Sequence, residues 1–439
     1  MDSYVEIDVR ATRTTSPEYA LWITIAGNLL EWFDWTIYAT FAPYIAKTMF
    51  APSDEISAML QTLAVFAVGF VARPIGGLLF GKFADTHGRR RALVTSMLLM
   101  ATGSLLIAVA PSFAQVGVMA SALLLVARLV QGFAHGGESG ASYVYIAELA
   151  PARSRGLWCS SAFASVTGGV VLGSLLGVVL TQTLDSALLQ SWGWRIPFVV
   201  GGGLAIFTFY LRRSAIESEA FQDNKREALV SPERARARSS RSAGLTRLRL
   251  FILISATVVV YYTWLGFATS YAVVNKGISE KLAFSASLAA QLICLLAMPF
   301  FGWLSDIVGR KPLALFTTIG FTLLSFPLDF LFQSSAWSLF ICQTIALLMF
   351  AATGAIYPAL LSEQLATSHR GASIGLVSSL SAAIFGGTAP YLNTWLTSIG
   401  AHWLFTSYTT ILCILATIAV ATMPETKGID LRVAGTETA

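Results

Sequence analysis

The segments GKFADTHGRR (residues 81–90) and GWLSDIVGRK (302–311) share the pattern G-x-x-x-D-x-x-G-R-[KR], with an offset of 221 residues from 81 to 302. Two further features recur at nearly the same offset. Glu148 with Arg155-Gly156 corresponds to Glu363 with Arg370-Gly371, and a Gly-Gly pair at 168 recurs at 386. Three unrelated features at one spacing indicate two sequence repeats. Repeats with the same membrane orientation are typical of proteins in which two helical bundles move around a central site.

The composition around these segments is that of an integral membrane protein. Of 439 residues, 55% are hydrophobic and only 12% are charged, far from the soluble average. Apolar stretches of about 20 residues, the length that a helix needs to cross a bilayer, recur along the chain, and the short alternating segments of a β-barrel are missing. We therefore predict an all-α membrane protein with twelve transmembrane helices in two six-helix bundles. The predicted spans begin near Tyr19, Ile56, Ala92, Gln115, Leu157, Trp192, Leu248, Leu282, Pro312, Trp337, Ala372 and His402.

Basic residues gather in alternate connections, as around residues 82–91, 153–155, 310–311 and 370. The positive-inside rule places these connections, and with them both termini, in the cytoplasm. Most of the net charge of +5 then lies where anionic lipid headgroups can attract it. The charge therefore does not indicate a nucleic-acid partner. We expect a cytoplasmic tail (1–18), an N-terminal bundle (19–213), a basic cytoplasmic linker (214–247), a C-terminal bundle (248–423) and a cytoplasmic tail (424–439).

The repeated segment and several others resemble the major facilitator superfamily. GKFADTHGRR is similar to its loop motif between spans two and three, and RLVQGFAHGG (128–137) resembles its fourth-span motif. Within the superfamily, GNLLEWFDW (27–35), VARPIGGLLFG (71–81), GGESG (136–140), WGWRIPF (192–198) and IFGG (384–387) resemble the metabolite:proton symporters. The resemblance covers nearly the whole chain. It implies the major facilitator fold, a monomer in a bacterial inner membrane, and protons and a small-molecule substrate as partners.

Members of this branch carry 2-oxoglutarate, citrate, shikimate, or proline and betaine. Because intramembrane arginines suit an anion, we favour a di- or tricarboxylate such as 2-oxoglutarate or citrate. The alternatives are a zwitterionic osmolyte and shikimate or an aromatic acid, and a more distant one is a membrane sensor that does not transport. Span five lacks the Gly-Pro kink of drug:proton antiporters, which favours symport.

The first predicted span carries two carboxylates, Glu31 and Asp34. Glu31 lies about 18 Å from the start of the span at 1.5 Å per residue, close to the middle of the bilayer. Charged groups at this depth are costly and usually mark a route for ions or protons. Arg128 in span four lies at a similar depth, and the resemblance to sugar:proton symporters implies that it pairs with Asp34. We predict proton coupling at these three residues, the alternative being a salt bridge that only fixes helix packing.

Substrate contacts are predicted at Arg73 and Arg128, because a guanidinium can hold a carboxylate with two hydrogen bonds. The alternative for Arg73 is that it extends to the cytoplasmic surface. His135 lies seven residues after Arg128 and is either a proton or anion site or a neutral, packed side chain, with Glu138 as a possible partner. Further substrate candidates are the aromatic residues Tyr38, Tyr262 and Tyr357.

The loop motif and its repeat suggest a cytoplasmic gate. Glycine permits close helix approach, and an aspartate can bind a helix N-terminus. The alternative is that the basic residues only set the orientation of the protein in the membrane. That role would explain the arginines but not the aspartates or the glycines. The predicted gate residues are Gly81, Asp85, Gly88, Arg89, Gly302, Asp306, Gly309 and Arg310.

Enzymatic function is not indicated. Four cysteines stand singly within predicted spans, four histidines form no metal-binding pattern, and no nucleotide-binding or nucleophile motif occurs. We expect no metal and no cofactor.

Overall fold

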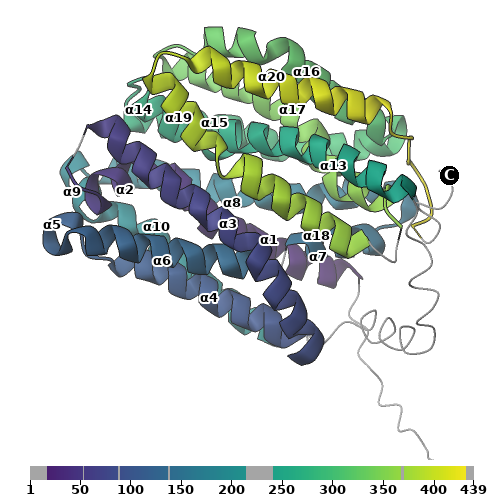
Figure 1. Cartoon of the computed structure of the whole chain (residues 1–439), viewed down its shortest axis with the longest axis horizontal. Helices are drawn as coiled ribbons and strands as arrows, with labels where there is room; N and C mark the ends of the chain where they lie inside the picture. Colours follow the sequence, from purple (N-terminus) through teal and green to yellow (C-terminus); the bar gives the residue numbers. More distant parts are fainter. Residues whose placement is uncertain are drawn as a thin grey trace, which may run out of the picture.

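The computed structural model describes residues 17–52, 54–87, 89–136, 139–213, 241–366 and 370–431, and this part of the chain contains helices and no strand. Figure 1 shows two groups of helices, one from the first half of the chain and one from the second, packed along one long interface. The fold class is therefore all-α, as predicted.

The N-terminal half consists of long helices joined by short ones. They are α1 (Pro17–Thr40), α2 (Ala42–Met49), α3 (Glu55–His87), α4 (Arg89–Val109), α5 (Phe113–Val116), α6 (Val118–His135), α7 (Ser139–Leu149), η1 (Ala152–Ser154), α8 (Arg155–Thr183), α9 (Ser186–Ser191), η2 (Gly193–Arg195) and α10 (Ile196–Arg213).

The C-terminal half has the same plan, with two π-helical turns. Its elements are α13 (Arg241–Val260), η3 (Tyr261–Gly266), α14 (Ala268–Val274), α15 (Glu280–Val308), α16 (Arg310–Leu331), α17 (Ala336–Glu363), α18 (Arg370–Ser381), η4 (Ala382–Gly386), α19 (Ala389–Ser398) and α20 (His402–Ala421). The π turns are η3 and η4, and such turns are frequently found at functional sites.

Nine helices of the described chain are long and apolar enough to cross a membrane, and the apolar stretches Val94–Val109 and Gly193–Phe207 are shorter. α1, which carries Glu31 and Asp34, stands at the place of the first predicted span. A helix thus stands at each of the twelve predicted spans. Nine of these described helices are long and apolar enough to cross a membrane, and α1, α4 and α10 are shorter or less apolar than that. The α13 helix begins at Arg241, within the segment predicted as a linker, because basic side chains let a helix continue beyond the apolar layer. Residues 214–240 lie outside the described part.

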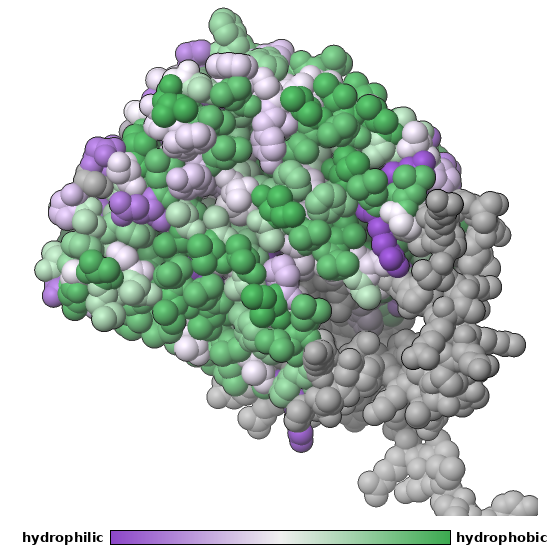
Figure 2. Space-filling view, in the orientation of Figure 1, coloured by the Kyte–Doolittle hydropathy of each residue, from purple (hydrophilic) through white to green (hydrophobic). Residues whose placement is uncertain are grey.

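Apolar side chains cover much of the outer surface, as Figure 2 shows. Leu78 is 71% exposed, Leu296 76% and Phe330 79%. Exposed apolar surface of this extent indicates a membrane-embedded protein.

Glycines bring α3 and α6 into close contact. A Cβ atom on Gly132 would collide with the backbone oxygen of Gly69, and one on Gly136 with that of Arg73. Small residues at such crossings let membrane helices approach closely. This crossing fixes the positions of Arg73 on α3 and Arg128 on α6.

The two halves meet at both ends of the molecule. We call the end where α1 and α13 begin and α10 ends the linker end. At the opposite end, the Ser270 hydroxyl donates to the backbone oxygen of Ala39 at 2.5 Å, and the rings of Phe41 and Phe284 are 5.7 Å apart. The interface is thus closed at that end, and polar contacts described below close it at the linker end.

Candidate functional site

Asp34 on α1 lies in a buried hydrogen-bond network within the N-terminal half. Its carboxylate accepts hydrogen bonds from the Ser104 hydroxyl on α4 and from Gln131 Nε2 on α6, the latter at 3.0 Å. Gln131 Nε2 also donates to Ser104 Oγ at 2.8 Å, and Gln131 Oε1 accepts from Arg128 Nη1 at 2.8 Å. Asp34, Ser104, Gln131 and Arg128 are each at most 1% exposed. The network therefore links Asp34 to Arg128 through one amide.

The predicted direct ion pair between Asp34 and Arg128 is not formed in this structure. Gln131, one helical turn after Arg128, lies between them, because side chains three residues apart share a helix face. Gln131 was not among the predicted site residues, although it stands in the fourth-span motif. Ser104 belongs to none of the sequence motifs, so its sequence context could not identify it as a site residue. The two charges remain coupled, but through a side chain that can rearrange.

Glu31 pairs with His135. Glu31 Oε1 lies 2.5 Å from His135 Nδ1, and the two residues are 8% and 1% exposed. The imidazole stacks on Trp35 with ring centroids 5.2 Å apart and meets Trp32 edge-on at 5.3 Å. The partner suggested for His135, Glu138, lies outside the described residues. His135 is thus both packed and placed to share a proton with a carboxylate.

Two arginines approach one indole ring. The Cζ atoms of Arg73 and Arg128 lie 3.8 Å and 4.1 Å from the ring centroid of Trp35. Arg73 is also 4.2 Å from the Phe70 ring and is only 5% exposed. Arg73 therefore does not extend to the surface, since stacking on Trp35 and Phe70 holds it inside.

These guanidinium groups have hydrogen-bonding capacity left over. Within the described residues, no acceptor meets hydrogen-bond geometry at Nε or Nη2 of Arg73 or of Arg128, although the Tyr262 hydroxyl lies close to Arg73. Buried cationic donors without acceptors are costly. Such donors suit an anion that arrives from elsewhere.

Aromatic rings from both halves surround this position. Tyr262, on the π turn η3, meets Phe70 edge-on at 5.1 Å, and Tyr261 meets Trp32 at 5.5 Å. The Tyr357 ring is 5.0 Å from Phe163. Tyr262 and Tyr357 thus lie at the interface between the halves, as a substrate contact requires.

Tyr38 is placed differently from the other two tyrosines. Its hydroxyl donates to the backbone oxygen of Thr62 at 3.0 Å, and its ring lies under Arg128 at 4.4 Å. All of these partners belong to the N-terminal half. Tyr38 therefore supports Arg128 and does not face the second half.

At the linker end, Glu363 of α17 joins the halves. Its carboxylate accepts from Arg155 Nη1 of α8 at 2.9 Å, from Arg310 Nη2 at 3.1 Å and from the Thr426 hydroxyl at 2.8 Å. Glu363 and Arg310 are 1% exposed. Because Arg155 belongs to the N-terminal half, this cluster holds the interface closed.

Asp306 makes a second contact across the interface. Its two oxygens accept from the backbone N–H groups of Gly156 and Leu157, at 2.8 Å and 2.9 Å. A carboxylate at a helix N-terminus satisfies otherwise unpaired donors and is favoured by the helix dipole. Gly302 lets the helices meet here, since a Cβ atom would collide with Ser160 and with the backbone oxygen of Gly156. We call Arg155, Asp306, Arg310 and Glu363 the latch.

The repeats exchange partners at this end. Glu363 binds Arg155 at 2.9 Å, and Glu148 binds Arg370 Nη1 at 3.0 Å. Each carboxylate of the repeated Glu…Arg-Gly pattern therefore pairs with the arginine of the other half. Gly309 has φ of +104°, and its missing side chain leaves room for Glu425, which accepts from the N–H groups of Arg310 and Lys311.

The first copy of the motif is only partly described. Gly81, Asp85 and Arg89 lie in helices, but the structure does not place the side chains of Asp85 and Arg89 or the surroundings of Gly81. Gly88 lies outside the described residues. Their role in the gate stays a prediction.

Gly201 of α10 supports Asp34, and we expect Gly201→Ala to disturb the network. A Cβ atom there would lie 2.6 Å from Asp34 Oδ1, which overpacks the site at a cost of about 1–3 kcal/mol. Gly203→Ala is the matched control, because a Cβ atom there meets nothing within 4 Å. It should be neutral, or stabilising by up to about 1 kcal/mol. Thermal unfolding in detergent compares the two, and equal stability would contradict this account.

Comparison with known proteins agrees with the fold. The family model described as "Sugar (and other) transporter" matches residues 19–245, and that of the "Major Facilitator Superfamily" matches 277–438. The chain is 34% identical to the alpha-ketoglutarate permease of Escherichia coli, covering 98% of this chain and 99% of that one. It is 31% identical to the citrate-proton symporter of Salmonella typhi, covering 85% and 86%.

Other relatives carry different names. A putative proline/betaine transporter of Staphylococcus haemolyticus is 32% identical, with 90% of this chain and 85% of that one covered. A crystal structure of a D-xylose-proton symporter superposes with a TM-score of 0.76 at 21% identity, covering 93% of this chain and 98% of that one. Apolar spanning helices, two related halves and full-length similarity to permeases lead to one conclusion: this multi-pass membrane protein belongs to the major facilitator superfamily and is a transporter, not an enzyme.

Proposed function

We propose that the protein is a proton-coupled symporter of a small organic acid, a di- or tricarboxylate such as 2-oxoglutarate or citrate, that works by alternating access in a bacterial inner membrane with both termini in the cytoplasm. The observation that carries this proposal is the pair of buried guanidinium groups on Trp35, with donors left over, beside two carboxylates that can take up protons.

Charge explains how protons and substrate are coupled. With Asp34 and Glu31 ionised and His135 neutral, the charges of Arg73 and Arg128 are balanced within the N-terminal half. Protonation of one carboxylate leaves one positive charge in excess. Because that excess attracts an anion, proton binding and substrate binding favour each other, and the coupling is reciprocal.

The number of buried guanidinium groups favours a di- or tricarboxylate over a zwitterionic osmolyte, which has a single carboxylate. Arg73 and Arg128 both have donors left over, and Arg73 stacks on Phe70, whose ring meets Tyr262 of the other half; its planar fork suits a carboxylate. The names of the relatives include both substrate classes, and shikimate or an aromatic acid is a second candidate because the interface offers rings for stacking.

Uptake into proteoliposomes tests the proposal. With an inward proton gradient, a radiolabelled di- or tricarboxylate should accumulate, and dissipating the gradient should stop its accumulation. The panel should contain 2-oxoglutarate, citrate, shikimate, proline and glycine betaine. Accumulation of the osmolytes alone would contradict the carboxylate assignment.

Arg73→Lys should weaken substrate binding. A lysine keeps the charge but loses the planar stacking on Trp35 and the two-point contact, so we expect KM to rise about tenfold or more, corresponding to about 1.5–3 kcal/mol of a charge-assisted hydrogen bond. Arg195→Lys is the matched control, since Arg195 also stacks on a tryptophan, Trp194, at 4.4 Å, but near the opposite end. An unchanged KM for Arg73→Lys would remove this residue from the substrate site.

A further inference from the structure

We propose that the coupling proton leaves Glu31 and Asp34 for the linker end through a water-holding cavity inside the N-terminal half, between α1, α4, α6 and α10, and not along the substrate path between the halves. This inference rests on the proposed proton coupling and adds a separate route for the proton.

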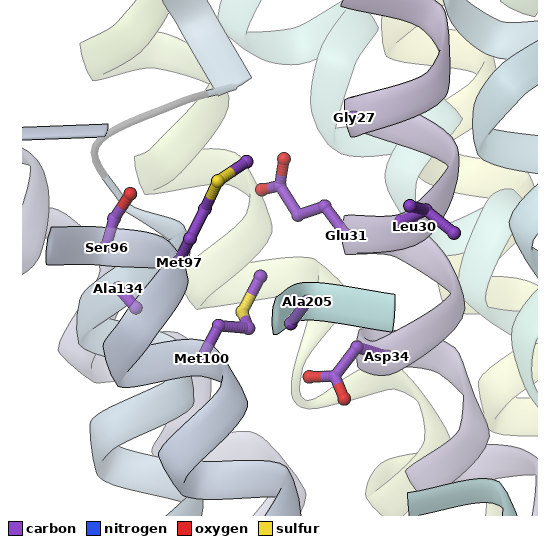
Figure 3. Close-up of a pocket in the computed structure, with 9 residues that line it drawn as sticks. All are labelled: Gly27, Leu30, Glu31, Asp34, Ser96, Met97, Met100, Ala134 and Ala205. Carbon is purple, nitrogen blue, oxygen red and sulfur yellow. The ribbon is translucent and has the colours of Figure 1, made fainter. Parts of the chain in front are cut away.

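The cavity is small and adjoins both carboxylates. Its volume is about 20 Å³, and Glu31, Asp34, Ser96, Met100, Ala134 and Ala205 are among the residues that line it. A site of about 10–15 Å³ with polar partners holds one water molecule. Figure 3 shows the two carboxylates directed from α1 toward the side where Met97 and Met100 of α4 lie, with Ala205 of α10 nearby. The cavity therefore has room and acceptors for one water.

Every described residue that lines the cavity belongs to the N-terminal half. The substrate candidates Arg73 and Tyr262 are not among those residues. His135 and Gln131 of α6 contact Glu31 and Asp34, and the cavity, which Ala134 of the same helix also lines, adjoins both carboxylates. The cavity therefore gives both carboxylates a contact that lies away from the interface between the halves.

The cavity lies toward the linker end. Ser96 is seven residues from the start of α4, and Ala205 is eight residues before the end of α10, so both are about 10–12 Å from that end at 1.5 Å per residue. At the same end the latch closes the interface through Glu363 and Arg155. A proton that leaves through the cavity does not have to pass the latch.

The step itself is a simple proton transfer. A water in the cavity takes the proton from the carboxylic acid, so that one O–H bond breaks and one forms, and then gives the proton to water on the side of the linker end. Among the described residues, the charged and titratable groups that act on the carboxylates from neighbouring helices are His135 and Arg128 of α6, Arg73 of α3 and Tyr143 of α7. The side of α4 and α10 that lines the cavity contributes Ser96, methionines and alanine, so water is the carrier on that side.

Filling the cavity tests the inference. Ala205→Leu and the smaller Ala205→Val add apolar volume from α10, Ala205→Ser keeps the volume, and Ile206→Phe adds bulk at a neighbouring position that is 39% exposed and outside the cavity. Each variant is reconstituted, and gradient-driven uptake and counterflow of labelled substrate are measured per folded protein.

The filled variants should lose proton-driven uptake selectively. We expect Ala205→Leu to slow gradient-driven uptake about tenfold, corresponding to about 1.4 kcal/mol on the barrier, with a smaller effect for Ala205→Val. Counterflow, which needs no net proton transfer, should stay near the wild-type rate, and Ala205→Ser and Ile206→Phe should transport normally.

Two results would overturn the inference: normal gradient-driven uptake in both filled variants, or an equal loss of uptake and counterflow in both. If the valine variant folds and the leucine variant does not, the same comparison is made with valine alone. A wild-type protein that shows no proton-driven accumulation would instead contradict the proposed function itself, so the two failures are distinguishable.

Discussion

Asp34→Asn should abolish accumulation driven by a proton gradient while exchange of labelled for unlabelled substrate continues. The amide resembles the protonated carboxylic acid in charge but can neither take up nor release a proton. Exchange requires only that the loaded carrier change conformation, and not net proton transfer. The expected result is therefore counterflow at a measurable rate without accumulation, measured in proteoliposomes per folded protein.

The hydrogen-bond network adds a detail to this result. Gln131 Nε2 donates to Asp34 Oδ2, and Gln131 Oε1 accepts from Arg128. An asparagine amide can keep its oxygen toward Gln131 Nε2 and place its NH₂ group at the Ser104 hydroxyl, which can also accept a hydrogen bond. The hydrogen bond between Gln131 and Arg128 can therefore persist, which is why exchange should continue.

A purely structural network would behave differently. Removing one partner of a buried charged pair costs about 3–5 kcal/mol, so folding, exchange and accumulation would fall together. Ser104→Ala is the control, because it removes one hydrogen bond to Asp34, worth about 1 kcal/mol, and keeps the carboxylate. It should still accumulate substrate. Accumulation by Asp34→Asn would refute the coupling role.

The second large effect is expected at the latch. Glu363→Gln removes the charge that binds Arg155 and Arg310, both almost fully buried. Loss of about 3–5 kcal/mol from the closed state shifts the equilibrium toward an open linker end by a factor of about 10² or more. Turnover should fall because the closed state is depopulated, whereas equilibrium substrate binding should be nearly unchanged.

Spin labels at Ala152 and Ala372, exposed positions in opposite halves, can report the opening as a longer distance. Glu425→Gln is the matched control. Glu425 accepts from the N-terminus of α16, wholly within the C-terminal half, so this change should leave the label distance as in the wild type. Lower affinity with normal turnover in Glu363→Gln would contradict a latch.

The sequence predicted the elements well because membrane helices are defined by local composition. The two halves followed from the repeated motif. The contacts of Gly302, Asp306 and Arg310 with α8 are consistent with the predicted gate, whereas Gly309 lies against Glu425 of its own half. The repeat did not show that Glu363 pairs with Arg155 of the other half. A single sequence does not reveal which side chains meet across the interface between the halves.

The sequence indicated that Asp34 and Arg128 lie at a similar depth, but the predicted direct pair between them is not formed in the structure. Asp34 and Arg128 are adjacent, but the Gln131 amide stands between them, and Glu31 binds His135. Such pairings depend on the rotation of each helix, which glycines such as Gly201 and Gly132 fix through close contacts. Depth along a helix can be counted from residues, but the direction in which a side chain points across the bundle cannot.

Proton movement driven by substrate alone tests the central claim most directly. Wild-type proteoliposomes loaded with a pH-sensitive dye receive an external pulse of 2-oxoglutarate or citrate, with no proton gradient imposed and the membrane voltage clamped. Symport predicts that the interior becomes more acidic as the transported acid enters, and that Asp34→Asn gives no pH change. Substrate entry without internal acidification would contradict the account.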